Sequence, residues 1–248
     1  MNRADKICWV LDLGVFPYCP AFGLQRRLTE ARKARAIPDV LLLCEHPHVI
    51  TLGRNGRREH LRADERLLAR MQVEFQPTDR GGDITYHGPG QIVGYPILDL
   101  AEHRRDVRWY VEQLEEVMIR TTADYEILGK RVEGKHGVWV ETPAGEEKLA
   151  ALGVHLSRWV TSHGFAYNVS TDLRYFGLIV PCGIPDRRAT SLERLLGRAV
   201  AKEEVCSRLV AHFSEIFDRA VVTVSRDDLE ATLQSHVVPA RSANESAA

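Results

Sequence analysis

Residues 80–91, RGGDITYHGPGQ, gather polar side chains on a glycine-rich backbone. The four glycines, Gly81, Gly82, Gly88 and Gly90, can take positive φ or let a ligand lie directly against backbone amides. The polar members set among them are Arg80, Thr85, Tyr86, His87 and Gln91. This composition suits the floor of a binding pocket. An ordinary glycine-rich turn is the alternative.

Cys182 is the cysteine whose surroundings best suit nucleophilic chemistry. Pro181 and Gly183 hold it outside any regular helix or strand, so its sulfur can be presented to a substrate. The other cysteines fall in apolar strand or helix patterns typical of a core, or in an ambiguous loop: Cys8, Cys44, Cys206 and, in the loop, Cys19. A free cysteine usually behaves as a small hydrophobic residue, and that alternative also stays open for Cys182.

Lys148 is the second candidate for chemistry. It opens the apolar run LAALG after an acidic turn, so its ammonium begins a strand near low-dielectric surroundings. A solvated lysine that pairs with Glu146 or Glu147 is the alternative, and these residues alone favour it. His46 and His48 could share a metal, but no third ligand lies at a recognisable spacing, so we expect this pair to shape a loop.

The composition of the chain bounds the class of protein. With 248 residues, 44% hydrophobic content and 27% charge, it has an ordinary globular composition. We expect a single domain over residues 1–235 and a flexible tail over 236–248. The formal net charge of −1 gives no signature of a nucleic-acid binder, so any charged partner must meet a local patch.

The same reading predicts a soluble protein of the reducing cytosol. Its first residues lack the pattern of a secretion signal, and no window approaches 18 uninterrupted apolar residues. The five cysteines are odd in number, scattered and without a CxxC pair, which argues against a disulfide framework and a zinc ribbon.

These residues must be positioned by a mixed set of strands and helices. Apolar runs predict strands over residues 7–14, 40–47, 49–53, 92–100, 138–141, 148–156 and 159–170. Apolar residues at spacings of three and four predict helices over 22–35, 107–121 and 205–216. A shorter helix is expected over 64–71, with Asp64 as its N-cap. Residues 171–188 show little periodicity.

Residues 80–96, RGGDITYHGPGQIVGYP, resemble the signature of the lipoyl(octanoyl) transferase family, also called lipoate-protein ligase B. Other segments look like the family's remaining marks, in the same order: EHPHVITLGR at 45–54, KLAALG at 148–153, GFAYNV at 164–169, PCGI at 181–184 and TSL at 190–192. Together they cover roughly residues 40–195, and a chance match of six ordered motifs is very unlikely.

The resemblance implies an enzyme that moves an octanoyl or lipoyl group from acyl carrier protein to a lysine of a lipoyl domain or of the glycine cleavage H protein. By this resemblance Cys182 is the nucleophile and Lys148 the acid and base. The implied substrate-binding residues are Arg80, Gly81, Gly82, Asp83, Ile84, Thr85, Tyr86, His87, Ala151, Leu152, Gly153, Gly164, Phe165 and Ala166. For His87, a structural role in the loop is equally compatible.

The fold implied is α/β, a mixed sheet flanked by helices, similar to the catalytic domain of biotin and lipoate protein ligases. No cofactor, metal, nucleic acid or membrane is expected, and we expect a monomer. Arg54, Arg57 and Arg58 are the expected patch for an acidic carrier. Two alternatives remain: an ATP-dependent lipoate or biotin ligase, which needs no nucleophilic cysteine, and a non-catalytic acyl-binding module.

Overall fold

A large mixed sheet forms the centre of the computed structural model, which describes residues 6–180 and 188–235. Its strands lie in the order β12 (Ala220–Thr223), β1 (Ile7–Val15), β2 (Asp39–Glu45), β6 (Gln91–Ile97), β10 (Val160–Asn168), β9 (Gly145–Ser157), β8 (Lys135–Thr142) and β7 (Gly129–Val132). The short β11 (Arg188–Ala189) pairs with β9.

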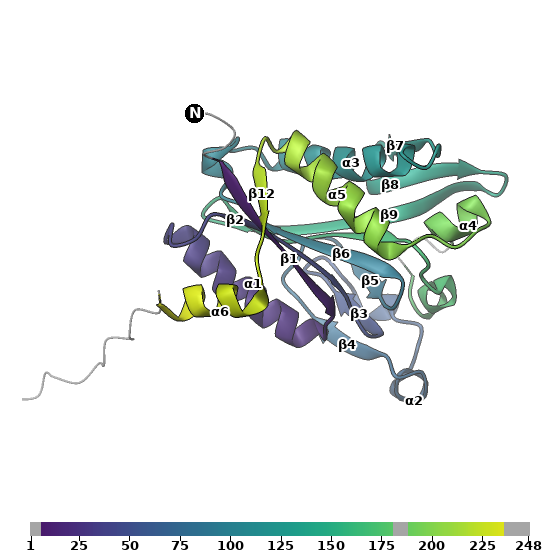
Figure 1. Cartoon of the computed structure of the whole chain (residues 1–248). Coiled ribbons are helices and arrows are strands. Elements are labelled where there is room, and N and C mark those ends of the chain that lie inside the picture. The colour runs from purple at the N-terminus through teal and green to yellow at the C-terminus, as the bar shows by residue number, and fades with distance from the viewer. Residues whose placement is uncertain (1–5, 181–187, 236–248) are drawn as a thin grey trace, which may run out of the picture.

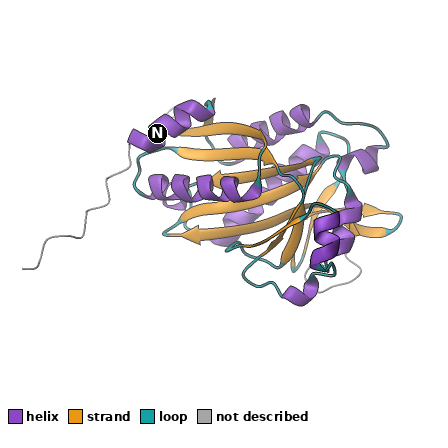
Figure 2. Ribbon diagram, turned by 90° about the horizontal axis from the view of Figure 1, so that it is seen from below, coloured by secondary structure: helices purple, strands orange, loops and turns teal. Residues whose placement is uncertain are grey.

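Helices cover both faces of this sheet (Figure 1). One face packs against α3 (Val107–Ala123) and α5 (Lys202–Ile216), whose apolar stripes meet strand residues in one buried cluster. The other face packs against α1 (Tyr18–Lys33) and α6 (Arg226–Ser235), as the view from below shows (Figure 2). Because β2 lies within the sheet and is covered by helices on both faces, all seven of its residues, DVLLLCE, are buried.

A second, three-stranded sheet lies beside the first. It contains β4 (Glu74–Pro77), β3 (Val49–Leu52) and β5 (Ile84–His87), in that order. The helix α2 (Glu65–Arg70) and a 3₁₀ helix, Leu173–Leu178, pack with it around a separate apolar cluster. Short 3₁₀ helices at Arg58–His60 and Leu100–Glu102 and the helix α4 (Leu192–Leu196) complete the described elements.

The strands and helices expected from the sequence are confirmed, with shifts at their ends. Asp64 caps α2, since its carboxylate accepts the Leu67 N–H at 2.8 Å. The first helix begins at Tyr18 rather than at residue 22, and this places Cys19 in a helix rather than in a loop. Residues 236–248, the expected flexible tail, lie outside the described residues.

Part of the glycine-rich segment is strand rather than loop. Residues 84–87 form β5 and pair antiparallel with β3, because Ile84 and Tyr86 can bury their side chains in the cluster of the small sheet. The strand β9 likewise begins at Gly145, three residues before Lys148, since its acidic start pairs with the end of β8. Within the described ranges, no helix is long and apolar enough to cross a membrane.

Candidate active site

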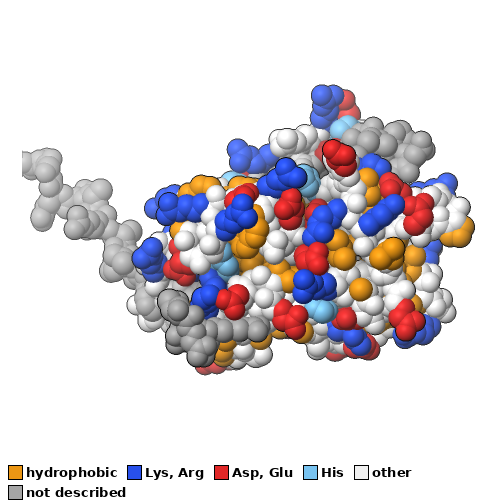
Figure 3. Space-filling model, turned by 90° about the horizontal axis from the view of Figure 1, so that it is seen from above, with side chains coloured by type: hydrophobic (Ala, Val, Ile, Leu, Met, Phe, Trp, Pro, Cys, Tyr) orange, Lys and Arg blue, Asp and Glu red, His pale blue; other side chains and the backbone are white. Residues whose placement is uncertain are grey.

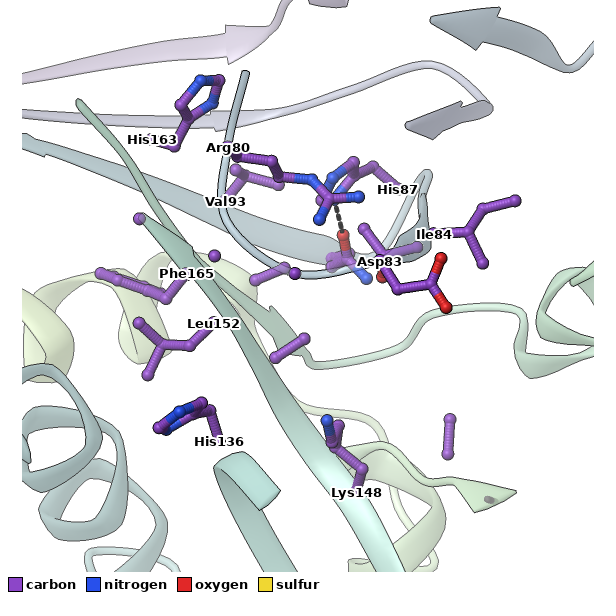
Figure 4. A pocket seen from close by; sticks show the side chains of 18 of the residues that line it. Arg80, Asp83, Ile84, His87, Val93, His136, Lys148, Leu152, His163 and Phe165 are labelled. Atoms are coloured by element: carbon purple, nitrogen blue, oxygen red, sulfur yellow. Dashed lines mark hydrogen bonds between the residues drawn. The ribbon is translucent and has the colours of Figure 1, made fainter. Parts of the chain in front are cut away.

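A cavity of about 200 Å³ opens between the two sheets. Strands β6, β9 and β10 of the large sheet form one wall, and β5 with the loop before it forms the other. Figure 4 shows Lys148 and His136 at one end of this cavity and Val93, His87 and His163 toward the other.

Small residues make the wall on β9 and β10 flat. Ala151 lies opposite Ala166, and Gly153 opposite Gly164, in the antiparallel register of the two strands. Directly paired residues share one face of a sheet, so these four form a continuous patch without bulky side chains. A Cβ atom on Gly153 would lie 2.9 Å from the carbonyl oxygen of Gly81, so only glycine fits there without a shift of the backbone. The result is a slot suited to an unbranched apolar chain.

Arg80 forms the opposite wall and is itself fixed by β3. Its Nη2 donates to the backbone oxygen of Thr51 at 2.7 Å, and its Nε donates to the Thr51 hydroxyl at 3.1 Å. The side chain is buried, with 7% of the residue exposed. These bonds hold the guanidinium against the small sheet and anchor the loop that follows.

Asp83 ties the same loop to its neighbours. Its Oδ2 accepts from His60 Nδ1 at 2.5 Å, and its Oδ1 accepts from the backbone N–H of Arg57 at 3.3 Å. The backbone N–H groups of Gly53 and Arg54 donate to carbonyls of the 80–83 loop. The arginines expected to meet a carrier protein therefore sit on a segment bonded directly to the cavity wall.

His87 belongs to a buried chain of hydrogen bonds that crosses the cavity. Its Nδ1 donates to Gln91 Oε1 at 2.7 Å, Gln91 Nε2 donates to Asn168 Oδ1 at 2.8 Å, and Asn168 Nδ2 donates to the Thr190 carbonyl at 3.0 Å. Burial, together with the neighbouring His46 and Arg80 side chains, lowers the pKa of His87 to about 3, although the Gln91 bond opposes the shift. His87 is thus neutral at pH 7, lines the cavity and also braces its wall.

Aromatic side chains close the cavity on the side of β6 and α1. Tyr95 donates its hydroxyl to His46 Nε2 at 2.7 Å, and His46 Nδ1 donates to a backbone oxygen at 2.6 Å. Tyr18 reaches in from α1 with its hydroxyl 3.1 Å from that of Thr78. His163 donates its Nε2 hydrogen to Asp79 Oδ1 at 2.7 Å. These polar atoms have partners within the protein, so this end offers an acyl tail mainly ring faces.

Lys148 reaches the cavity because β9 is irregular next to it. The pairing shifts from Val138 opposite Ala150 to Trp139 opposite Lys148, so one residue of β9, Leu149, is extra. Leu149 and Ala150 are both buried in the cluster under α3 and α5, although consecutive strand residues normally face opposite sides. This bulge turns Lys148 onto the cavity face and Glu147 to the other, and bulges commonly re-aim side chains in this way.

Most of the residues singled out in the sequence come together at this cavity. Its lining includes Lys148 and all the implied substrate-binding residues except Gly81 and Tyr86. Tyr86 points instead into the cluster of the small sheet, where its hydroxyl lies 2.7 Å from His48 Nδ1 and its ring stacks on Tyr175. In the structure Tyr86 thus supports the wall from behind, and its expected contact with substrate stays a prediction.

Cys182 lies outside the described residues, and its role stays a prediction. Of the described cysteines, Cys8 and Cys44 are buried, and burial raises the pKa of each thiol. Burial also raises the pKa of Cys206 to about 12, and Cys19 is exposed on α1. None of these four lines the cavity.

Over residues 6–180 and 188–235, no three His, Cys, Asp or Glu side chains gather as metal ligands would.

Several lining residues were not singled out from the sequence: Tyr18, Val93, Tyr95, Lys135, His136, His163, Asn168, Phe176, Arg188 and Ala189, with Gly134 at the turn before β8. Asn168 stands inside GFAYNV, a segment that the sequence marked, so its polar side chain in an apolar strand was a usable signal. Tyr18 gave none, because a tyrosine at a helix start is ordinary.

The chain resembles known proteins along most of its length. Residues 17–214 match the family model described as the lipoyl protein ligase A/B catalytic domain. The octanoyltransferase of Solibacter usitatus is 54% identical over 211 residues, which are 85% of this chain and 93% of that protein. The octanoyltransferase of Koribacter versatilis is 48% identical over 236 residues, 94% of this chain and 92% of that protein.

Solved structures share the fold at low identity. A bipartite lipoate protein ligase from Thermoplasma acidophilum superposes with a TM-score of 0.70 at 16% identity, covering 93% of this chain and 91% of that one. A lipoate-protein ligase A bound with ATP gives a TM-score of 0.65 at 13% identity, covering 95% and 94%. The mixed α/β fold expected from the sequence is confirmed.

Proposed function

The chain belongs to the lipoyl protein ligase A/B catalytic-domain family and is an octanoyltransferase like its relatives, and from this premise we propose a donor, an acceptor and an intermediate. The donor is octanoyl acyl carrier protein. The acceptor is a lysine of a lipoyl domain or of the glycine cleavage H protein. The acyl group passes through a thioester on Cys182, and a lipoyl group can follow the same route.

The observation that supports this proposal most directly is the slot with Lys148 at one end. The patch of Ala151, Gly153, Gly164 and Ala166 accepts an apolar chain, and the Lys148 side chain lines the same cavity. Arg188 and Ala189 also line it, and Cys182 precedes Arg188 by six residues, a stretch of chain that spans at most about 20 Å. The length of this stretch therefore allows Cys182 to reach the cavity.

In the first half-reaction, the Cys182 thiolate attacks the carbonyl carbon of the carrier's thioester. A new carbon–sulfur bond forms, the bond to the pantetheine sulfur breaks, and Lys148 gives that departing sulfur its proton. An ordinary cysteine, with a pKa near 8.5, is mostly protonated at neutral pH. A neighbouring ammonium favours the thiolate, which is why a cysteine and a lysine suit this step together.

In the second half-reaction, the amine of the acceptor lysine attacks the Cys182 thioester. An amide bond forms, the carbon–sulfur bond breaks, and the Cys182 thiolate is restored. The neutral amine of Lys148, left after the first step, takes the proton that the incoming nitrogen loses. Backbone N–H groups of the glycine turns meet the thioester oxygen as negative charge develops on it.

Selectivity for the acyl chain follows from the length of the slot. An eight-carbon chain has no polar group to recognise, and each buried methylene contributes about 0.8 kcal/mol. Chains that fill the slot bind best, and chains too long for it must displace the aromatic side chains at its closed end.

The proposal is tested by supplying octanoyl carrier protein and a lipoyl domain without ATP. We expect the domain to gain one octanoyl group in the intact mass spectrum. A control with free octanoic acid in place of the carrier, with and without ATP, should give no product. Product from octanoic acid that depends on ATP would instead identify an ATP-dependent ligase. Binding of octanoate without product in any reaction would identify a non-catalytic acyl-binding module.

A further inference from the structure

An aromatic ring lies directly beside the amine of Lys148. Lys148 Nζ is 4.7 Å from the centroid of the Trp139 ring, within the range of a cation–π interaction. Trp139 is 1% exposed and is among the largest fully buried side chains of the described residues. The amine therefore lies against a flat surface of the protein interior, and not in open solvent.

The backbone fixes this pair in place. Trp139 on β8 and Lys148 on β9 are directly opposite in the antiparallel register, so their side chains share a face of the sheet. The indole Nε1 donates to the backbone oxygen of Lys135 at 3.1 Å, which sets the orientation of the ring. The same β9 bulge that turns Lys148 to the cavity also brings it opposite Trp139.

A second ammonium group shares the ring. Lys135 Nζ is 5.1 Å from the same centroid and donates to Glu146 Oε2 at 3.0 Å. Lys130 Nζ lies 2.9 Å from the other carboxylate oxygen of Glu146. The carboxylate of Glu146 is thus engaged by both Lys130 and Lys135, and these ion pairs tie down the ammonium group of Lys135.

We propose that Trp139 is a positioning residue for Lys148: the face of the indole holds the Lys148 ammonium at the cavity, where it can act on the thioester. This inference rests on the proposed function. The ring is attracted to the ammonium but not to the neutral amine, so it steadies the group before its proton is transferred and releases it afterwards. Trp139 itself takes no part in the bond changes.

A double-mutant cycle between Trp139→Leu and Lys148→Ala tests this inference. Two readouts serve: the single-turnover rate of octanoyl transfer, and the rate of Cys182 alkylation against pH, resolved by peptide mass spectrometry. Trp139→Leu should lower transfer roughly 2- to 30-fold, the range that corresponds to a cation–π contact, and should change the alkylation profile. In the Lys148→Ala background it should change neither.

Two further variants separate positioning from support of the fold. Trp139→Phe keeps an aromatic face and should recover part of the loss. Trp109→Leu removes an indole that packs from α3 against the apolar cluster under α3 and α5 and does not line the cavity, and it should leave the alkylation profile unchanged. An equal loss from Trp139→Leu in both backgrounds, or no loss in either, would overturn the inference. Full activity of Lys148→Ala alone would instead count against the proposed function.

Discussion

Lys148 is the residue on which the proton transfers of the proposed mechanism depend. Lys148→Ala should lower octanoyl transfer about 100- to 10,000-fold, the usual contribution of a general acid or base. Lys148→Arg should fail as well, because a guanidinium keeps its proton and cannot act as a base. Rates of transfer to a lipoyl domain, measured for both variants, check this expectation.

The slot should survive these substitutions, because Lys148 only lines one end of it. Binding of octanoate, measured by calorimetry, is therefore the control and should be nearly unchanged in Lys148→Ala. Near-normal transfer by that variant would return Lys148 to the role of a surface lysine.

His87 should make the folded protein sensitive to mild acid. Its pKa is about 3 in the folded state, mainly because of burial, against about 6.5 when unfolded. Between these values only the unfolded chain takes up the proton, so the stability from this group is complete above pH 6.5 and declines as pH falls. The loss amounts to about 1.4 kcal/mol per pH unit.

Urea unfolding at pH 7.0 and 5.5 measures this effect. His87→Gln should reduce the difference in unfolding free energy between the two pH values by about 1.4 kcal/mol relative to wild type. His136→Gln, at a histidine whose side chain is 77% exposed, serves as the control. If both variants keep the pH dependence of the wild type, His87 is not the group that titrates.

The sequence showed which residue types gather at the site better than it showed where their side chains point. The GPGQ and GFAYNV segments marked Gln91 and Asn168 as part of the right region, yet their hydrogen bond depends on the pairing of β6 with β10. The direction of Tyr86, into the cluster of the small sheet, follows from the pairing of residues 84–87 with β3, which the sequence did not show. The direction in which the Lys148 side chain points depends on the bulge at Leu149, and no residue type in this segment predicts such a bulge.

Among the elements, α1 limits how far an acyl tail can extend. Tyr18 lies at the start of this helix and lines the cavity across β6 and β10 from Lys148. Lys148 lies at the other end of the cavity, so an acyl chain whose reacting carbonyl is at Lys148 points its tail toward this ring. Tyr18 should therefore set the upper limit on chain length.

Tyr18→Ala should raise the ratio of decanoyl to octanoyl transfer roughly tenfold, because two further methylenes then find room at about 0.8 kcal/mol each. The matched variant Tyr18→Phe keeps the ring and should leave this ratio unchanged. Competition between the two acyl carriers, resolved by the mass of the product, gives the ratio in one reaction. An unchanged ratio in Tyr18→Ala would place the limit elsewhere.

Elements with a full apolar pattern were predictable, and short edge elements were not. The helix α3 is buried on one side, and its sequence shows this as a stripe of apolar residues. The strand β2 is buried on both sides, and its sequence shows this as a continuous apolar run. The strands β4, β7 and β12 have four residues each, with at most one of them buried, so their sequences carry little alternation. Their pairing comes from neighbours distant in the sequence, and that information is absent from a local window.

For the molecule as a whole, partner recognition must come from local charge. The face seen in Figure 3 carries basic and acidic side chains interspersed, in keeping with the net charge of −1. Arg54, Arg57 and Arg58 are exposed next to the cavity wall, but Arg58 lies over the Phe75 ring at 4.4 Å. Arg54 and Arg57 are thus the better candidates to meet an acidic carrier.

The double variant Arg54→Glu, Arg57→Glu should weaken carrier binding more at 50 mM salt than at 500 mM, because exposed charges are screened at distances beyond roughly 10 Å at 0.1 M. Arg104→Glu, Arg105→Glu changes the net charge equally beyond the far end of β6 and should have little effect. Calorimetric titration with octanoyl carrier protein provides the comparison. Equal losses at both salt concentrations would exclude an electrostatic docking role.

The order of motifs along the chain predicted the site better than any one motif did. The described segments at 80–96, 148–153 and 164–169 are far apart in sequence, yet all three line one cavity, because β6, β10 and β9 are neighbours in the large sheet and β5 lines the opposite wall. The residues of a single segment do not predict this arrangement, because it depends on strand pairing between distant segments. The local sequence alone was therefore ambiguous. It left Lys148 as a solvated residue and Cys182 as an undecided thiol.

The intact mass of the protein after incubation with octanoyl carrier protein alone tests the central claim most directly. Without an acceptor, the wild type should gain the mass of one octanoyl group, removable by hydroxylamine, and peptide mapping should locate it on Cys182. Cys19→Ser, which changes the exposed cysteine on α1, should be acylated normally, and Cys182→Ser should lose turnover. An unmodified wild type that still octanoylates a lipoyl domain, or full turnover by Cys182→Ser, would contradict a cysteine thioester.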